Sequence, residues 1–434
     1  MNISSKSSSG SSDPNYKIGY AWLVWGLAAT FYFSDYMARV APGVMHRYLQ
    51  LDFGINEVGF ATLTAFFYIP YILMQIPVGL TVDRIKIRYL LTIMSIITAI
   101  GCCVFGAANG LAMASFARLL IGFSAAFAFI SALRLATSWF PPAMLGLLAG
   151  LTQALGMLGA SAGQAPLSFL VSAVGWRHSM FVIASFFVGL AVLLFMYIQD
   201  KPMSDSSTTQ SSSKPHINII QSLRIILSSR QTWINALYAG FLYGPTTVIG
   251  EAMGPAYLEY GRGLSAHAAA FATGLIFIGW VVGGPFTGFI SDRIGRRKPC
   301  MVISAVCGIV LTSLLVFYPH MSRNMAYGIF FLFGLTNSGV SIAYAVSTEL
   351  HQRYVVGTAI AFTNMMSIFV GATLQPIVGH LVDSVAAGRA YHVETLLLSD
   401  FQYGLRILPL SSLIAFVLAL MVKETYCKPM TGLK

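Results

Sequence analysis

The chain has 434 residues, of which 56% are hydrophobic and only 9% are charged. Soluble proteins carry about 25% charged residues, so this composition excludes an ordinary soluble domain and predicts a chain that lies mostly in a membrane. The net charge of +11 does not indicate a nucleic-acid partner, because the basic residues are spread over many short loops.

The chain begins with a polar, serine-rich stretch at 1–18, which we expect to be a disordered cytoplasmic tail. It lacks the basic-then-apolar order of a cleaved signal peptide. An N-terminal six-helix half is expected at 19–198, because six apolar segments there are each long enough to cross a bilayer. These segments are 19–44, 57–80, 89–108, 111–136, 144–171 and 177–198.

A second half repeats this organisation after a polar, serine- and threonine-rich break. We expect a cytoplasmic linker at 199–230 that ends in a short amphipathic helix on the membrane surface. A C-terminal six-helix half at 231–422 and a cytoplasmic tail at 423–434 follow. The apolar segments of this half are 232–259, 266–290, 299–318, 325–348, 356–382 and 401–422. The predicted fold class is an all-α membrane protein with twelve transmembrane helices in two six-helix halves.

The loops predict an orientation. With the N-terminus inside, eighteen lysines and arginines fall on the cytoplasmic side and five arginines fall in the outer loops. Basic residues prefer the cytoplasmic side, so both termini are expected in the cytoplasm.

Motifs for an enzyme or a bound cofactor are missing from the sequence. There is no His-Glu-x-x-His, no Gly-x-Ser-x-Gly and no Gly-Lys-Ser/Thr phosphate loop. The five cysteines follow neither a metal-ligand spacing nor a secreted disulfide pattern. We therefore expect no enzymatic activity, no cofactor and no metal.

Two similar charged stretches lie 209 positions apart. "GLTVDRIKIRY" covers Gly79–Tyr89 and "GFISDRIGRRK" covers Gly288–Lys298, each between the second and third apolar segments of its half. Matching places in the two halves predict a tandem repeat, as in some secondary transporters.

These stretches resemble the signature loop of the major facilitator superfamily, G-x-x-x-D-R-x-G-R-R. The later copy matches at Gly288, Asp292, Arg293, Gly295, Arg296 and Arg297. The earlier copy keeps Gly79, Asp83, Arg84 and Arg88, but has Lys86 and Ile87 where the family has Gly and Arg. "RLLIGFSAA", Arg118–Ala126, resembles the family's motif in the fourth segment. The resemblance covers about residues 19–422.

Within the family, "ARVAPGVMHRYLQLDFGI" followed by "YIPYILMQIPVGLTVDR" resembles a bacterial branch related to lysosomal dipeptide transporters and to nutrient permeases of intracellular bacteria. The resemblance implies a bacterial inner-membrane protein that works as a monomer. It also implies that the signature loops lock the two halves together on the cytoplasmic side. Gly288 would let a neighbouring element come close, and Asp292 would pair with an arginine or with a helix end. The altered first copy of the loop implies a weaker lock between the halves at 79–89.

Charged residues inside membrane spans are costly, so they are candidates for function. Asp35 and Arg39 lie four residues apart on one helix face, so they can pair. They are either a structural ion pair, or a proton-exchanging carboxylate beside an arginine that binds an anionic substrate group. Arg118 is either cavity-facing or structural, and Glu251 is a second candidate for proton coupling.

Uncharged polar residues add further candidates. We expect Tyr36 and Tyr71 to line a cavity, and Asn337 and Asn364 either to bind substrate or to join helices by hydrogen bonds. Small residues such as Gly159 should let neighbouring helices approach closely.

The sequence therefore predicts a secondary active transporter that works by alternating access. Its expected role is proton-coupled import of a small polar organic solute, such as an amino acid, a short peptide or a related metabolite. The partners are then the solute, protons and the lipid bilayer, with no nucleic acid. The alternatives are an organic-anion symporter, a drug/proton antiporter or a non-transporting sensor. The fifth segment, 144–171, lacks the Gly-Pro pair of the family's exporters, which disfavours the antiporter.

Overall fold

The structure is a computed structural model that describes residues 14–141, 144–199, 219–352, 355–386 and 395–428. The regular structure in these ranges is helical throughout. Residues 1–13 of the expected first tail, 200–218 of the expected linker and 429–434 of the expected last tail lie outside them.

The first group of helices comprises α1 to α8. Its elements are α1 (Pro14–Val44), α2 (His46–Phe53), α3 (Glu57–Ala65), α4 (Tyr68–Arg84), α5 (Ile87–Gly106), α6 (Leu111–Trp139), α7 (Leu145–Ala162) and α8 (Ala165–Tyr197). The chain turns sharply inside α8 at Gly175, where φ is 80°. That left-handed value suits glycine, which has no Cβ.

The second group comprises α9 to α18 and contains two π-helical segments, η2 and η3. Its elements are α9 (Ile219–Ser228), α10 (Arg230–Pro245), η2 (Thr246–Met253), α11 (Gly254–Ala256), η3 (Tyr257–Gly261), α12 (Ala266–Ile294), α13 (Lys298–Phe317), α14 (Arg323–Asn337), α15 (Val340–Leu350), α16 (Val356–Ala386), α17 (Leu398–Leu405) and α18 (Ile407–Met421).

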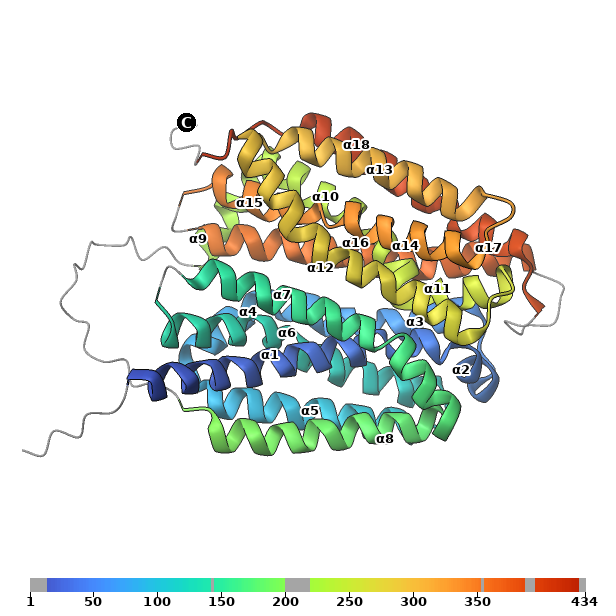
Figure 1. The fold of residues 1–434 in the computed structure, drawn as a ribbon, viewed down its shortest axis with the longest axis horizontal. Helices are drawn as coiled ribbons and strands as arrows, with labels where there is room; N and C mark the ends of the chain where they lie inside the picture. The colour runs from blue at the N-terminus through green and yellow to red at the C-terminus, as the bar shows by residue number, and fades with distance from the viewer. Residues whose placement is uncertain (1–13, 142–143, 200–218, 353–354, 387–394, 429–434) are drawn as a thin grey trace, which may run out of the picture.

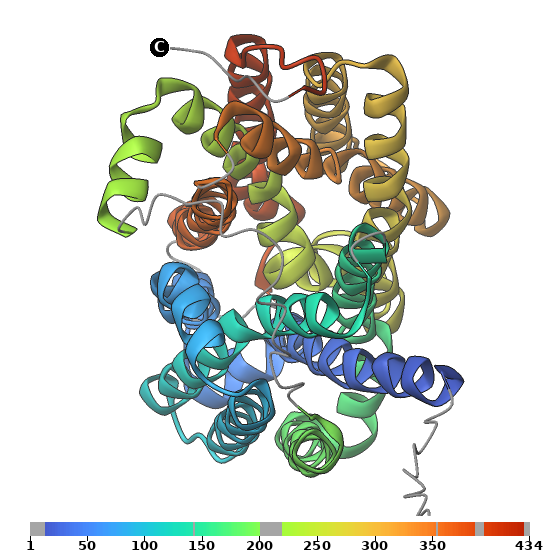
Figure 2. The same ribbon diagram turned by 90° about the vertical axis from the view of Figure 1, so that its left-hand side faces the viewer.

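The long helices of both groups run side by side along the longest axis of the molecule. Figure 1 shows the first group below and the second group above, and Figure 2 shows the same two groups seen along the bundle. We call the end that carries the loop between α12 and α13 the motif end, which is on the left of Figure 1. The opposite end, where α2 lies and α3 begins, is the distal end.

The outside of the bundle is apolar, as a bilayer requires. Leu73 and Phe289 are 69% and 62% exposed, whereas Asp35, Arg39 and Glu251 are each 2% exposed. Nine helices among the described residues are long and apolar enough to cross a membrane. One of them, Leu145–Tyr197, holds two spans because of the turn at Gly175. Together with α1 and the α10–η3 segment, the described residues supply twelve spans.

Small residues bring helices of one group together, as the sequence predicted. A Cβ placed on Gly159 of α7 would lie 1.9 Å from the carbonyl oxygen of Phe33 on α1. Any larger residue there would force the two helices apart.

The two groups meet along three sets of helices. The first group's α3 and α4 pack against α16, its α7 and α8 pack against α12, and α1 packs against η2 and α11. The contact between α1 and η2 brings together Arg39 and Glu251, two of the charged candidates inside the membrane spans.

Candidate functional site

A buried ion pair joins the two groups. Nε of Arg39 on α1 lies 3.0 Å from Oε2 of Glu251 on η2, and each side chain is 1% exposed. The hydroxyl of Tyr243 donates to Oε1 of Glu251 at 2.9 Å, and that of Tyr68 donates to Oε2. A buried carboxylate is costly unless it is paired and hydrogen-bonded, and these three donors satisfy it.

The pair between Asp35 and Arg39 that helical spacing allows is not formed in the structure. Arg39 reaches across the interface, where Glu251 offers a carboxylate that two tyrosines already hold in place. Spacing of four residues permits contact on a helix but does not compel it, so the stronger partner on the other group prevails. Asp35 is 2% exposed, and its Oδ1 has no hydrogen-bond partner among the described residues.

Aromatic rings surround the guanidinium of Arg39. Its Cζ lies 5.0 Å from the ring centroids of both Tyr36 and Tyr68, and 5.8 Å from that of Tyr71. Aromatic faces attract a cation without using its N–H groups. The Nη2 of Arg39 has no hydrogen-bond partner among the described residues, so one N–H donor group of this buried arginine is unused.

Arg118 on α6 supports the backbone of α1. Its Nη1 donates to the carbonyl of Ala38 at 3.1 Å, and its Nη2 donates to that of Arg39 at 3.0 Å. Pro42 has no N–H to complete the helical bond to Ala38, so Arg118 supplies a donor for that carbonyl. These contacts support the structural one of the two interpretations of Arg118.

Glu251 lies on a π-helix, a rare form that is frequent at functional sites. Two buried amides hold this segment. Gln164, from the first group, donates to the carbonyl of Gly250 at 2.9 Å, and Gln375 on α16 donates to that of Thr247 at 3.0 Å. The position of Glu251 therefore depends on both groups.

The two candidate asparagines differ in their surroundings. Asn364 on α16 accepts from the hydroxyl of Tyr344 and donates to Oε1 of Gln75 on α4, both at 3.0 Å, so it links the groups. Asn337 donates to Oγ1 of Thr246 at 3.3 Å and supports η2 from within the second group.

At the motif end, Arg297 of the signature loop forms its ion pairs within the second group. Gly295 ends α12 with φ of 69°, a left-handed conformation that favours glycine. Arg297 lies 2.6 Å from Oδ1 of Asp292 and 2.7 Å from Oε1 of Glu349. Burial disfavours the charge on Arg297, but hydrogen bonds to Glu349 and Asp292 outweigh it and raise the pKa of the guanidinium.

The close approach expected at Gly288 is absent. A Cβ on Gly288, or on Gly79 in the first copy, would meet nothing within 4 Å. The reason is that no element of the other group lies against either glycine in this conformation. Arg293 and Arg296 are exposed, and Arg88 lies over the ring of Phe195 at 4.2 Å. The side chains of Asp83 and Arg84 lie outside the described residues.

The distal end, in contrast, is bridged between the groups. Asp383 near the end of α16 accepts from the backbone N–H groups of Glu57 at 3.2 Å and of Val58 at 2.9 Å, both on α3. Further in, the hydroxyl of Thr64 donates to Oε1 of Gln375 at 2.9 Å. Asp383 was not among the residues predicted from the sequence, because its only signal there is its position just after the apolar segment 356–382.

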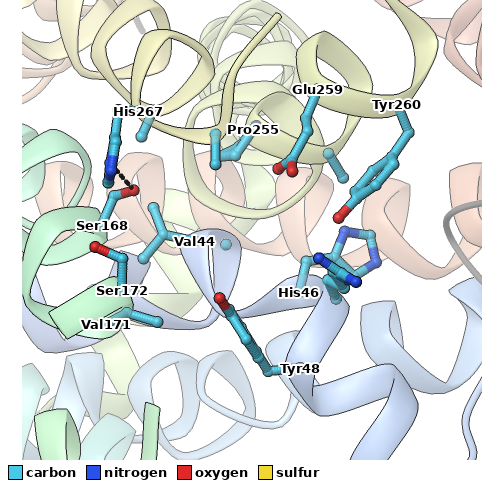
Figure 3. Close-up of a pocket in the computed structure, with 15 residues that line it drawn as sticks. Val44, His46, Tyr48, Ser168, Val171, Ser172, Pro255, Glu259, Tyr260 and His267 are labelled. Atoms are coloured by element: carbon cyan, nitrogen blue, oxygen red, sulfur yellow. Dashed lines mark hydrogen bonds between the residues drawn. The ribbon is translucent and has the colours of Figure 1, made fainter. Parts of the chain in front are cut away.

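A cavity of about 140 Å³ also lies at the distal end, between the groups (Figure 3). His46 on α2 and Ser168 on α8 line it from the first group, and Glu259 on η3 and His267 on α12 line it from the second. Ser168 Oγ lies 3.1 Å from His267 Nδ1. No set of three or more His, Cys, Asp or Glu residues suited to a metal ion occurs within the described ranges.

Comparison with known proteins shows where this architecture belongs. The sequence profile of the Major Facilitator Superfamily matches residues 24–376. A probable sulfoacetate transporter of Cupriavidus necator is 24% identical over 83% of this chain and 87% of its own length. A hexuronate transporter of Bacillus subtilis is 21% identical over 80% of this chain and 85% of its own. A probable galactarate/D-glucarate transporter of Escherichia coli is 22% identical over 84% and 88%.

Solved structures share the fold. A bacterial homologue of the human lysosomal transporter Spinster, in an inward-facing, unoccupied conformation, superimposes with a TM-score of 0.75 at 16% identity, over 95% of this chain and 98% of that one. The nucleoside transporter NupG gives a TM-score of 0.70 at 14% identity, over 92% and 99%. These likenesses confirm the predicted fold class. The chain belongs to the Major Facilitator Superfamily, and it is a multi-pass membrane transporter of small molecules rather than an enzyme.

Proposed function

We propose that the chain imports a small organic anion together with protons, by alternating access. The observation that carries this proposal is the buried Arg39–Glu251 pair, in which Arg39 keeps an unused donor at Nη2. A carboxylate or sulfonate of a substrate can take the place of Glu251 on the guanidinium, which binds such groups with two parallel N–H donors.

The same geometry couples the anion to a proton. If the substrate displaces an ionised Glu251 from Arg39, a buried carboxylate loses its ion pair, at a cost of about 3–5 kcal/mol. Protonation of Glu251 removes that cost and leaves one anion paired with Arg39. Substrate anion and proton therefore load together.

The names of the relatives support an anionic substrate. They are described as transporters of sulfoacetate, hexuronate and galactarate or D-glucarate, all organic anions. This favours the organic-anion symporter over an amino acid or peptide importer. The latter stays the second candidate because the buried Oδ1 of Asp35 lacks a hydrogen-bond partner and would suit an ammonium group.

Orientation and assembly complete the proposal. The motif end faces the cytoplasm of a bacterial cell, because the basic residues gather there, and both termini lie on that side. The halves 19–198 and 231–422 rock as units about the linker 199–230, and one chain suffices for transport. The conformation described then opens toward the cytoplasm.

Transport in proteoliposomes tests the central role of Glu251. The substrate is first selected by a thermal-shift screen of sugar acids, sulfonates, amino acids and peptides, since a bound ligand stabilises the native state. Glu251→Gln should reduce accumulation driven by a pH gradient at least about tenfold, while exchange of labelled for unlabelled substrate persists. Gradient-driven accumulation at the wild-type level would refute the coupling role.

Variants of the neighbouring charges separate the two substrate classes. Arg39→Lys should weaken binding of an organic anion about tenfold or more, because lysine keeps the charge but loses the planar pair of donors. Asp35→Asn should leave anion uptake largely intact. If Asp35→Asn abolishes uptake and an amino acid is the ligand found in the screen, the second candidate replaces the first.

A further inference from the structure

The start of α3 is capped by two different parts of the chain. The first N–H groups of a helix have no partner within it and need acceptors from elsewhere. Asn56, the residue before α3, accepts from Gly59 N at 3.0 Å. The N–H groups of Glu57 and Val58 are instead bound by Asp383 of the second group, 326 and 325 positions away.

This contact is stronger than a typical polar contact. A carboxylate on backbone N–H groups forms charge-assisted hydrogen bonds, and the N-terminal end of a helix carries partial positive charge. Asp383 is only 9% exposed, so solvent screens the interaction little. If α3 and α16 separated, the two N–H groups of α3 would lose their acceptor.

The backbones around Asp383 are in direct contact. One turn earlier on α16, a Cβ on Gly379 would lie 2.8 Å from the carbonyl oxygen of Glu57. On the first group's side, Nε2 of His46 lies 3.1 Å from Oε2 of Glu57, and the His46 ring stacks on Phe60 at 3.8 Å. His46 also lines the distal cavity in Figure 3, so one side chain contacts both that cavity and the first turn of α3.

We propose that Asp383 is the gate residue of the distal end: it completes the cap of α3 only while that end is closed, and it releases α3 when the end opens. The inference rests on alternating access from the proposed function, but not on the solute or the coupling ion. It assigns Asp383 a role in positioning α3, with no contact to substrate.

Asp400 provides a matched control. It is likewise a buried acid at the distal end, and its Oδ2 accepts from Leu397 N at 2.8 Å to cap α17. Both partners of that cap belong to the second group. Asp400→Asn therefore weakens a helix cap formed within the second group, whereas Asp383→Asn weakens a cap that crosses between the groups.

The test measures how often the distal end opens. Ala61 on α3 is fully buried, and a Cβ on Gly379 would lie 3.1 Å from its own Cβ. Ala61→Cys is introduced into a chain whose five native cysteines are replaced by alanine. Sealed vesicles are then treated with a membrane-impermeant maleimide from the side that the distal end faces.

Asp383→Asn should speed the labelling of Cys at position 61 at least about fivefold, a shift typical of conformational coupling. Asp400→Asn should leave the rate unchanged. Equal rates in wild type and Asp383→Asn, or equal acceleration by both variants, would overturn the proposal. Because labelling needs no substrate, a failure of the Glu251 experiment and a failure here are distinguishable.

A second variant protects the test if Asp383→Asn does not fold. Glu57→Pro removes one of the two donors and leaves Asp383 itself intact, and proline suits the first position of a helix. Its control, Glu57→Ala, keeps the N–H group. Glu57→Pro should label faster than Glu57→Ala, and equal rates for this pair would contradict the gate.

Discussion

The two ends of the molecule each place an aspartate near the end of a long helix, but they use it differently. At the motif end, Asp292 pairs with Arg297, five residues further along the chain. At the distal end, Asp383 binds the backbone of α3 in the other group. A Cβ would meet open space at Gly288 but backbone at Gly379. Asp383 therefore bridges the two groups at the distal end, while Arg297 of the signature loop is bound within the second group at the motif end.

The largest effect should come from breaking the motif-end network. Glu349→Ala removes the carboxylate that lies 2.7 Å from Arg297, where the two side chains are 9% and 11% exposed. Arg297 would stay buried with only Asp292 as ionic partner, so we expect a loss of about 3 kcal/mol in the free energy of unfolding. Denaturant unfolding of the purified protein in detergent measures it.

An exposed pair at the distal end is the control for that prediction. Asp52 and Arg177 lie 3.3 Å apart, with side chains 41% and 35% exposed. Such pairs contribute about 1 kcal/mol or less, so Asp52→Asn should change stability far less than Glu349→Ala. Similar losses for the two variants would mean that burial does not set the strength of the motif-end network.

The second prediction exploits the two glycines. Gly379→Val should push α3 and α16 apart at a cost of about 1–3 kcal/mol, and so favour opening of the distal end. The valine side chain of Gly288→Val would contact nothing in the conformation described, so the free energy of unfolding should stay unchanged. Transport should fall, because the added side chain prevents the motif end from closing. Maleimide labelling at position 61 and uptake check the two effects. Faster labelling in Gly288→Val than in Gly379→Val would contradict the view that the contact at Gly379 keeps the distal end closed.

The smallest effect concerns His351, between α15 and α16 at the motif end. Burial lowers the pKa of its imidazole below the usual 6.5, and its Nε2 lies 2.8 Å from Thr232 Oγ1. The unfolded chain then binds more protons near that pH, so stability rises with pH and is lost as the pH falls through 6.5. Melting temperatures at about pH 5 and about pH 8 should differ less in His351→Gln than in wild type. An unchanged difference would exclude His351 as its source.

Local patterns predicted what depends on neighbouring residues. The repeat of charged loops led to the fold class, and the glycine of the signature loop stands at Gly295, where the backbone needs a positive φ. The glycine pattern also predicted the close contact at Gly159. Each of these features follows from sterics or from spacing within a short segment.

Contacts between the groups escaped prediction for a physical reason. Helical spacing proposes Asp35 as the partner of Arg39, but the actual partner is 212 positions away and lies on a π-helix that spacing does not reveal. Asp383 resembles any acid at the end of an apolar segment until the first turn of α3 is placed beside it. A single sequence carries no record of which helix end faces which.

The π-helix η2 has a consequence for chain length. Its i to i+5 bonding holds more residues in each turn than an α-helix does. The segment Thr246–Met253 can therefore lose one residue if its backbone changes from π-helical to ordinary α-helical bonding. The elements α11 and η3 would then keep their register. The same deletion within α13 would rotate everything beyond it by about 100° around the helix axis. A one-residue deletion that would shift every later residue of α13 around the helix can thus be tolerated in the segment that carries Glu251.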